Sequence, residues 1–273
     1  MIVLRNKDNP LEQQPVAEEH AKAAAASSRR VIDVLFYFAE HQPIASVKEI
    51  AEALRLPVPT VHRYVAMLRQ QGILARSGRG RYRVTAVAES LGRAARAGNA
   101  LIHVAEPFMR ELAAAIDETV VLAQLIDDDA VCVHRIEASR RIRLTMTTGM
   151  RLPPLRGATS KVLVSALPQA ERDAHIDRMI QANPELARER KAFLKEVDRA
   201  ASAGWATSLE EIDDGVWATA ALVRNGGHDI AALTVPCPLF RLDEQLRRRI
   251  ANEVRVSARR ISDALAHGRN RHA

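Results

Sequence analysis

The chain has 273 residues, a formal net charge of +7 and 47% hydrophobic residues. This length allows about two domains with cores of their own, and the two cysteines are too few for a disulfide framework, which indicates a reducing cytoplasm. Residues 1–26 lack the long apolar core of a signal peptide, and no apolar run approaches the roughly 18 residues of a membrane-spanning helix.

The positive charge is concentrated in two parts of the chain. Residues 27–98 contain 12 Lys/Arg and 5 Asp/Glu, whereas residues 99–240 contain 16 and 20. Residues 241–273 contain 9 and 4, although the arginines there could simply form the solvated face of a helix. A basic N-terminal part joined to an acidic middle favours a nucleic-acid reader attached to a domain with another task.

The N-terminal part is predicted to contain a flexible or partly helical tail over residues 1–26 and three short helices after it. Apolar side chains recur with helical spacing within residues 28–41, 47–54 and 61–68. Each of these helices is therefore expected to bury one face, and together they would form a small three-helix core.

Local signals mark where these helices begin and end. Ser46 followed by Glu49 is a capping box at the start of the second helix. Pro57 ends that helix, because the residue before a proline is pushed out of helical geometry, and Pro59 suits the start of the next one. Gly72 then ends the third helix.

A basic hairpin around Ser77-Gly78-Arg79-Gly80 follows the third helix, and this order is typical of a winged helix-turn-helix over residues 27–88. Such a module inserts its third helix into the major groove of double-stranded DNA. The alternative, a small helical subdomain with a charged solvated face, does not account for the hairpin. The expected DNA contacts are Ser46, Val58, Thr60, His62, Arg63, Arg69, Arg76, Arg79 and Arg81.

The rest of the chain is predicted to form an α+β domain with a mostly antiparallel sheet. Residues 86–117 are expected to be helical throughout, with residues 89–117 serving as a linker or dimerisation segment before a domain over residues 118–273. Within that domain the pattern predicts strands at 119–126, 130–137 and 141–148, helices at 169–181 and 184–203, a hairpin of 216–223 with 229–235, and a last helix at 243–266.

No catalytic chemistry is indicated. The histidines and cysteines show no metal-ligand spacing, and there is no glycine-rich phosphate loop. Thr159-Ser160-Lys161 is not a Ser-x-x-Lys nucleophile motif, because Ala158 stands where the serine would be needed. We therefore expect no catalytic residue, no metal ligand and no cofactor.

Three stretches resemble motifs of the IclR family of bacterial transcription regulators, over roughly residues 27–266. They are Leu56-Pro57-Val58-Pro59-Thr60-Val61-His62-Arg63, the loop from Gly149 to Lys161, and Gly204-Trp205-Ala206-Thr207-Ser208 with Glu211 and Gly215-Val216. The resemblance implies a profilin- or GAF-like ligand-sensing C-terminal domain. It also implies operator binding as a dimer or a dimer of dimers, and control of catabolic genes.

The same resemblance implies an effector site formed by Leu155, Gly157, Ala158, Thr159, Ser160, Glu211, Ala220, Val223, Thr234, Pro236 and Cys237. A helix N-terminus at Gly157 would attract a carboxylate, and with Arg156 nearby a small organic acid is the expected effector. Thr159 and Ser160 could instead only cap that helix, and Cys237 could be a core residue. The alternative function is a winged-helix DNA-binding protein with no small-molecule effector.

Overall fold

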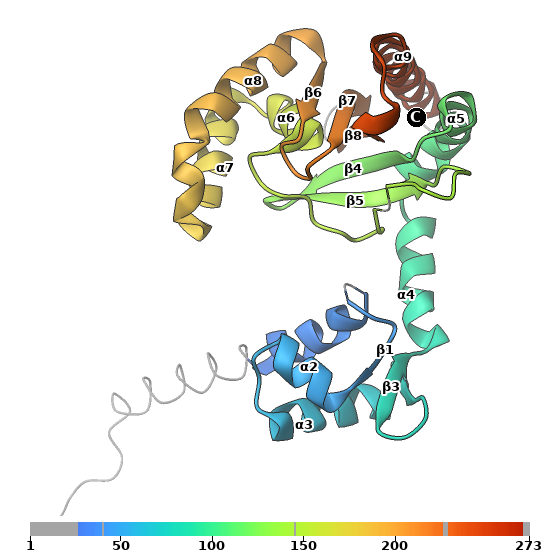
Figure 1. The fold of residues 1–273 in the computed structure, drawn as a ribbon, viewed down its shortest axis with the longest axis vertical. Helices are drawn as coiled ribbons and strands as arrows, with labels where there is room; N and C mark the ends of the chain where they lie inside the picture. The colour runs from blue at the N-terminus through green and yellow to red at the C-terminus, as the bar shows by residue number, and fades with distance from the viewer. Residues whose placement is uncertain (1–26, 40, 145, 226–228, 270–273) are drawn as a thin grey trace, which may run out of the picture. The chain divides into compact units, whose positions relative to one another are not determined.

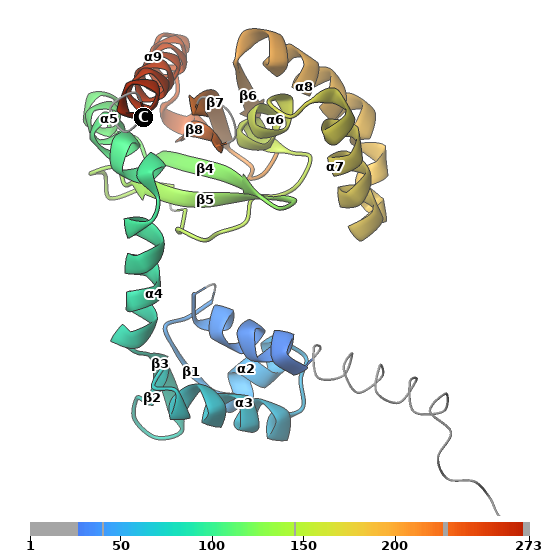
Figure 2. The same cartoon turned by 180° about the vertical axis from the view of Figure 1, so that it is seen from behind.

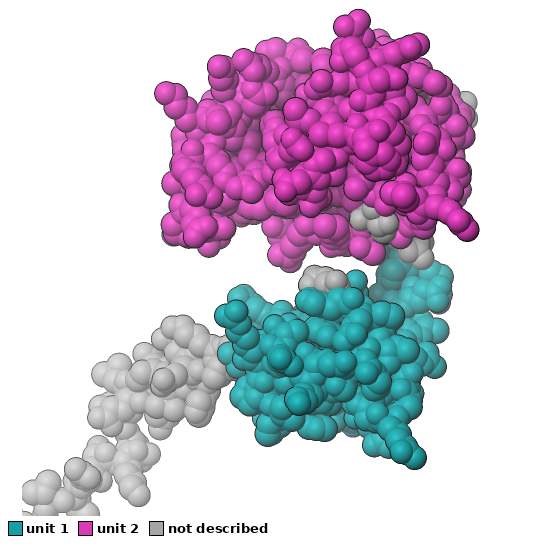
Figure 3. All heavy atoms as spheres, in the orientation of Figure 1, with its two compact units in different colours: residues 1–98 teal, residues 99–273 magenta. Residues whose placement is uncertain are grey.

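The computed structural model describes residues 27–39, 41–144, 146–225 and 229–269. The chain forms two compact units, residues 1–98 and residues 99–273 (Figure 3). Each unit has a hydrophobic core of its own. The tail expected over residues 1–26 lies outside the described residues.

Unit 1 contains the winged helix-turn-helix that the sequence predicts (Figure 1). A helix at residues 27–39 precedes α2 (Val47–Ala53) and α3 (Val58–Gln70). The wing is a three-stranded antiparallel sheet in the order β1-β3-β2. Its strands are β1 (Ile44–Ser46), β2 (Leu74–Arg76) and β3 (Arg81–Val84), and α4 (Ala86–Ala97) follows. Strand β1 was not expected, because three residues are too few to show a period.

The predicted capping box and the position of Pro59 are confirmed, but Pro57 does not end α2, which already stops at Ala53 with Arg55 in a left-handed conformation (φ 52°). The Ser46 hydroxyl accepts the Glu49 N–H at 3.3 Å, and the Ser46 N–H donates to the Glu49 carboxylate at 2.6 Å. These two bonds satisfy donors that a helix start otherwise leaves unpaired. Pro59 lies in the first turn of α3, where a missing N–H removes no helical hydrogen bond.

Unit 2 is an antiparallel five-stranded sheet in the order β5-β4-β8-β7-β6, with helices on both faces (Figures 1 and 2). The strands are β4 (Val120–Ile126), β5 (Asp129–Ile136), β6 (Trp205–Leu209), β7 (Val216–Asn225) and β8 (Asp229–Pro238). Helices α5 (Ala100–Ile116) and α9 (Glu244–Arg269) pack on one face. Helix α6 (Gly157–Ser165) packs on the other, next to α7 (Gln169–Ala182), η1 (Pro184–Arg188) and α8 (Arg190–Ala203).

Helix α6 is buried along its whole length. The sheet face beneath it carries small side chains, among them Ala123, Ala220 and Ala232. Alanines let the backbones of helix and sheet approach closely, so that α8 can pack against α6 from outside. A helix that is buried on all sides must satisfy its polar groups within the protein, and this requirement shapes the site described below.

Four further details differ from the sequence-based expectation. Residues 86–117 form two helices rather than one, because Asn99 caps α5 by accepting the Ile102 N–H at 3.3 Å. The described residues of the expected strand at 141–148 form a loop that has no strand partner. The helix expected at 184–203 starts as the separate 3-10 turn η1. Strand β6 was not predicted at all.

Because the two cores are separate, truncating a buried side chain in one unit should leave the stability of the other unit unchanged. Ile50 and Leu122 are both fully buried, one in each core. Truncation of either to alanine should cost about 2–5 kcal/mol in its own unit. Both tryptophans lie in unit 2, so their fluorescence should report Leu122→Ala but not Ile50→Ala during urea unfolding. Equal shifts of the fluorescence midpoint by both variants would contradict two separate cores.

Candidate functional site

The outward face of α3 carries most of the residues expected to read DNA. Val58, His62, Arg63 and Arg69 are exposed there, and Thr60 is half-buried. The opposite face is buried in the unit 1 core through Val61, Tyr64, Val65 and Leu68. Because one face of α3 is buried in the core, the opposite face is the one available to a DNA groove.

The wing residues divide into two groups. Arg76 and Arg79 are exposed, and neither forms an ion pair within the described part of the chain. Arg81 instead donates to the Ile44 carbonyl at 3.0 Å and to the Glu49 carboxylate at 3.2 Å. Arg81 thus ties the wing to the start of α2, and Ser46 is engaged in the capping box. Arg83 on β3 is a further exposed wing arginine, and the two-residue period of a strand places it on the same side as Arg81.

Unit 2 contains a cavity of about 370 Å³ between the start of α6, the start of β7, the end of β8, and two loops. Five of the expected effector residues line it: Ala158, Thr159, Glu211, Thr234 and Pro236. The residues that the sequence did not identify are Leu144, Met146, Met150, Arg151, Leu152, Pro153, Ser208, Ile212, Asp213, Val216 and Ala218. Most of the lining is apolar, and the hydroxyls of Thr159, Thr234 and Ser208 supply neutral polar groups.

The other six expected effector residues lie outside the cavity lining. Val223 and Cys237 point to the opposite face of the sheet, into the core beneath α5 and α9. Ala220 is covered by α6, and Leu155 is packed in the core between α6, α7 and α8. Ser160 donates to the Pro153 carbonyl at 3.2 Å, and the Gly157 N–H is bonded to Glu211. In this structure these six residues therefore pack in the core or form hydrogen bonds that hold the backbone around α6.

The carboxylate of Glu211 occupies the N-terminus of α6. It accepts the Gly157 N–H at 3.0 Å and lies 2.5 Å from the Lys161 amine, which also donates to the Thr207 carbonyl at 3.1 Å. Lys161 is 5% exposed in its side chain, so its charge needs a close partner. Gly157 has φ +79°, a conformation that L side chains rarely adopt, and a Cβ there would also push against the Ile212 side chain, so glycine is strongly favoured. The N-terminus of α6 is therefore a carboxylate niche that Glu211 fills.

Arg156 does not face the cavity. Its guanidinium donates to the Glu189 carboxylate at 2.5 and 2.8 Å, which raises the pKa of Arg156 and lowers that of Glu189. Arg151, which does line the cavity, pairs with Asp129 at 2.8 Å. Neither arginine is thus free to bind a ligand anion without giving up an existing partner.

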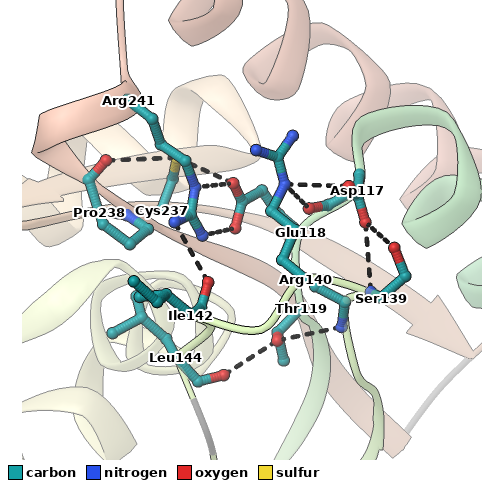
Figure 4. Close-up of polar contacts among 11 residues, drawn as sticks. Asp117, Glu118, Thr119, Ser139, Arg140, Ile142, Leu144, Cys237, Pro238 and Arg241 are labelled. Atoms are coloured by element: carbon teal, nitrogen blue, oxygen red, sulfur yellow. Dashed lines mark hydrogen bonds and ion pairs between the residues drawn. The ribbon is translucent and has the colours of Figure 1, made fainter.

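A group of polar residues holds the loop that forms one wall of the cavity (Figure 4). Glu118, 1% exposed, accepts two hydrogen bonds from Arg241 at 2.6 and 2.7 Å. Arg241 also donates to the Ile142 carbonyl at 3.3 Å. The Thr119 hydroxyl donates to the Leu144 carbonyl at 2.9 Å. Side chains therefore supply the hydrogen bonds that a strand neighbour would otherwise provide, and they place Leu144 against the cavity.

The described residues offer neither a metal centre nor a reactive thiol. No group of three or more His, Cys, Asp or Glu side chains that could hold a metal ion occurs among them. Burial raises the pKa of the Cys132 thiol to about 11 and that of the Cys237 thiol to about 12. Both thiols stay protonated at neutral pH, and only the thiolate is a good nucleophile. None of the described helices is long and apolar enough to cross a membrane.

A winged helix-turn-helix with a cationic outer face, in one chain with a second unit that contains a cavity, defines the architecture of a DNA-binding regulator. Family models agree with this description. Residues 27–78 match the IclR helix-turn-helix domain, and residues 94–263 match the bacterial transcriptional regulator IclR C-terminal domain. The chain therefore belongs to the IclR family of bacterial transcriptional regulators.

Individual relatives agree with this assignment. The chain is similar to the HTH-type transcriptional regulator KipR of Bacillus subtilis, with 28% identity over 70% of this chain and 78% of that protein. It is also similar to the HTH-type transcriptional repressor AllR of Escherichia coli K12, with 27% identity over 97% of this chain and 98% of that protein.

Solved structures share the fold. An IclR homolog complexed with 4-hydroxybenzoate from Microbacterium hydrocarbonoxydans has a TM-score of 0.69 at 22% identity, over 88% of this chain and 98% of the other. An IclR family transcriptional regulator from Brucella abortus has a TM-score of 0.67 at 22% identity, over 88% and 92%.

The contacts of the cavity wall predict a specific effect of Thr119→Val. This change keeps the shape of a fully buried side chain but removes the hydroxyl that holds Leu144. Amide hydrogen exchange over residues 142–147 should accelerate by about tenfold, because this segment loses one hydrogen bond of about 1.4 kcal/mol. The second bond of the hydroxyl, accepted from the Ala138 N–H at 3.4 Å, lies outside the segment. Thr219→Val is the matched control, since Thr219 is equally buried but bonds Ala206 within the sheet. Unchanged exchange over 142–147 in Thr119→Val would show that the loop is held by other contacts.

Proposed function

We propose that the chain binds a palindromic operator as a dimer or dimer of dimers and changes its DNA affinity when a small organic metabolite enters the cavity of unit 2. It would act on DNA in the cytoplasm, without catalysis and without a cofactor. The observation that carries the proposal is the presence in one chain of an exposed cationic recognition helix and a cavity of about 370 Å³. A band-shift assay with the full chain, with and without ligand, tests it. Operator binding that no ligand alters would favour the alternative of a regulator with no effector.

The carboxylate niche at α6 supports a carboxylate as the anionic group of this metabolite. The niche already accepts one carboxylate, that of Glu211, and a ligand carboxylate would have to displace it. The apolar lining and the hydroxyls of Thr159 and Thr234 suit a compact organic body. A thermal-shift screen of small carboxylates, 4-hydroxybenzoate among them, against their uncharged amides would test the ligand class. Stronger stabilisation by the amides would overturn the carboxylate assignment.

Exposed apolar side chains in unit 1 support association with a second copy of the chain. Ile32 and Phe36 are 53% and 51% exposed on the first helix, and Val87 and Leu91 are 50% and 62% exposed on α4. Each pair is four residues apart and so lies on one side of its helix. An isologous contact between two copies would bury both pairs. Sedimentation should show Leu91→Glu as a monomer where the parent chain is a dimer.

The assignment of DNA contacts predicts different effects for Arg63→Ala and Arg79→Ala. Arg63 is exposed on the groove-facing side of α3, so its loss should cost about 1–3 kcal/mol on an operator selected from random-sequence DNA and much less on unrelated DNA. Arg79 lies at the wing turn and should contribute equally on both DNAs and lower the salt dependence of binding. Arg81 is unsuitable for this test, because its loss also frees Glu49. Equal losses on both DNAs for Arg63→Ala would argue against base contact.

If the ligand binds in the cavity, a variant whose larger side chain fills the cavity should lose its response to the ligand. Ala158→Trp is the direct test of the α6 contact, but Ala158 is 1% exposed, so a large side chain there would also disturb the core. Ala218 lines the same cavity and is only half-buried, so Ala218→Phe should fill the space with little cost to the fold. Ligand-induced stabilisation should disappear while operator binding by the ligand-free protein stays normal. A folded Ala218→Phe protein with an unchanged ligand response would place the effector elsewhere.

A further inference from the structure

A second hollow in unit 2, separate from the effector cavity, is lined by three arginines. It measures about 280 Å³ and is formed by the start of β6, the end of β7 and one face of α9. Arg255 and Arg259 lie one turn apart on α9, and Arg224 faces them from β7. Helix α9 packs on β7, so these arginines converge from two elements onto one space instead of forming a row along a ridge.

Among the described residues, no carboxylate pairs with any of these three guanidinium groups. Most arginines of unit 2 pair with a carboxylate, as Arg260 does with Glu111 at 2.8 Å. Within the described residues, none of Arg224, Arg255 and Arg259 has such a partner, although all three are exposed. Three cations that share one hollow repel each other, and an anion between them would relieve that repulsion.

An aromatic ring and the backbone define the rest of the hollow. The Arg255 guanidinium lies 5.3 Å from the centre of the half-buried Trp205 ring, a cation–π contact that orients the side chain without neutralising it. Ser262 is already engaged, because its hydroxyl accepts the Arg224 N–H at 3.0 Å and donates to the Ala258 carbonyl at 2.8 Å. The charged groups that this hollow offers to a ligand are therefore the three guanidinium forks.

We propose that this hollow binds the phosphoryl group of a small phosphorylated metabolite. Guanidinium forks match phosphate oxygens in geometry, and three of them suit a dianion better than a single carboxylate. A volume of about 280 Å³ is near the lower end of small-molecule sites, at roughly 300 Å³, and leaves room for a short organic group beside Trp205. The three arginines converge on one hollow and do not follow a row, which favours a small molecule over the continuous backbone of duplex DNA.

Calorimetric titration of the full chain with inorganic phosphate and with glycerol phosphate, at constant ionic strength, tests the proposal. We expect saturable binding of both probes, and tighter binding of the ester if the organic group contacts Trp205. Arg255→Gln and Arg259→Gln should each weaken binding by about tenfold, as expected for the loss of a charge-assisted hydrogen bond. Arg141→Gln is the matched control, because Arg141 is exposed, has no ion pair among the described residues and lies outside the hollow.

Three results would overturn the proposal. The first is no saturable binding of either probe. The second is equal weakening by Arg141→Gln and by the two hollow variants, which would mean non-specific attraction. The third is a loss of affinity for random duplex DNA in Arg255→Gln without any phosphate binding, which would make the hollow a DNA contact. Circular dichroism of each variant should match the parent chain, because these exposed arginines support no core packing.

Discussion

The organisation of unit 2 depends on the need to satisfy the polar groups of a helix that is buried on every side. Helix α6 starts with a glycine N–H and contains a lysine whose side chain is 5% exposed, and water cannot serve either group well. Glu211 satisfies both with one carboxylate, and so fixes the loop from Glu210 to Gly215 against the helix start. That loop supplies Ile212 and Asp213 to the cavity, so the same contact that completes α6 also forms one wall of the candidate ligand site.

The opposite wall is held by a related arrangement. The loop after β5 returns to that strand only at its far end, where Gly149 and Leu152 donate to the Cys132 and Ala130 carbonyls. Nearer β5, the carbonyls of Ile142, Leu144 and Met146 accept hydrogen bonds from the side chains of Arg241, Thr119 and Arg135. A buried pair such as Glu118 with Arg241 adds little net stability, because desolvation offsets most of the Coulomb attraction. Its geometry, however, is specific, since a bidentate pair permits few arrangements. The pair therefore contributes more to the position of the wall than to the stability of the unit.

Sequence patterns were most informative where period and end signals coincide. These patterns predicted the helices and wing of unit 1 and the β7–β8 hairpin. In each of these elements, apolar residues recur on one face over at least two helical turns or several strand residues. The strand period could also have divided the expected effector residues between the two faces of the sheet. Pro236 and Cys237 are neighbours on one strand, and Ala220 and Val223 are three apart, so within each pair the side chains must lie on opposite faces.

Other features could not be predicted from local patterns. Ile142, Leu144 and Met146 alternate as in a strand, yet Ile142 is 70% exposed and the segment is a loop, because its partners are side chains distant in sequence. Likewise, the sequence places Arg156 next to Gly157 but does not reveal that Glu189, 33 residues later, pairs with it. Contacts between remote polar side chains depend on the assembled fold and leave no period in the sequence.

Pairing, rather than the number of arginines, distinguishes the surfaces of this chain. In unit 2 most guanidinium groups are matched by carboxylates, as Arg178 is by Asp128 at 2.7 Å. In the described part of unit 1, Arg81 and Arg93 are the arginines with ion pairs, and both lie away from the outward face of α3. The charge of Arg63, Arg76 and Arg79 therefore remains available to phosphates, whose counterions would be released on binding. The recognition helix, the wing and the arginine hollow of unit 2 share arginines whose charge is not paired with a carboxylate among the described residues. Net charge alone would not have distinguished these surfaces from those with paired arginines.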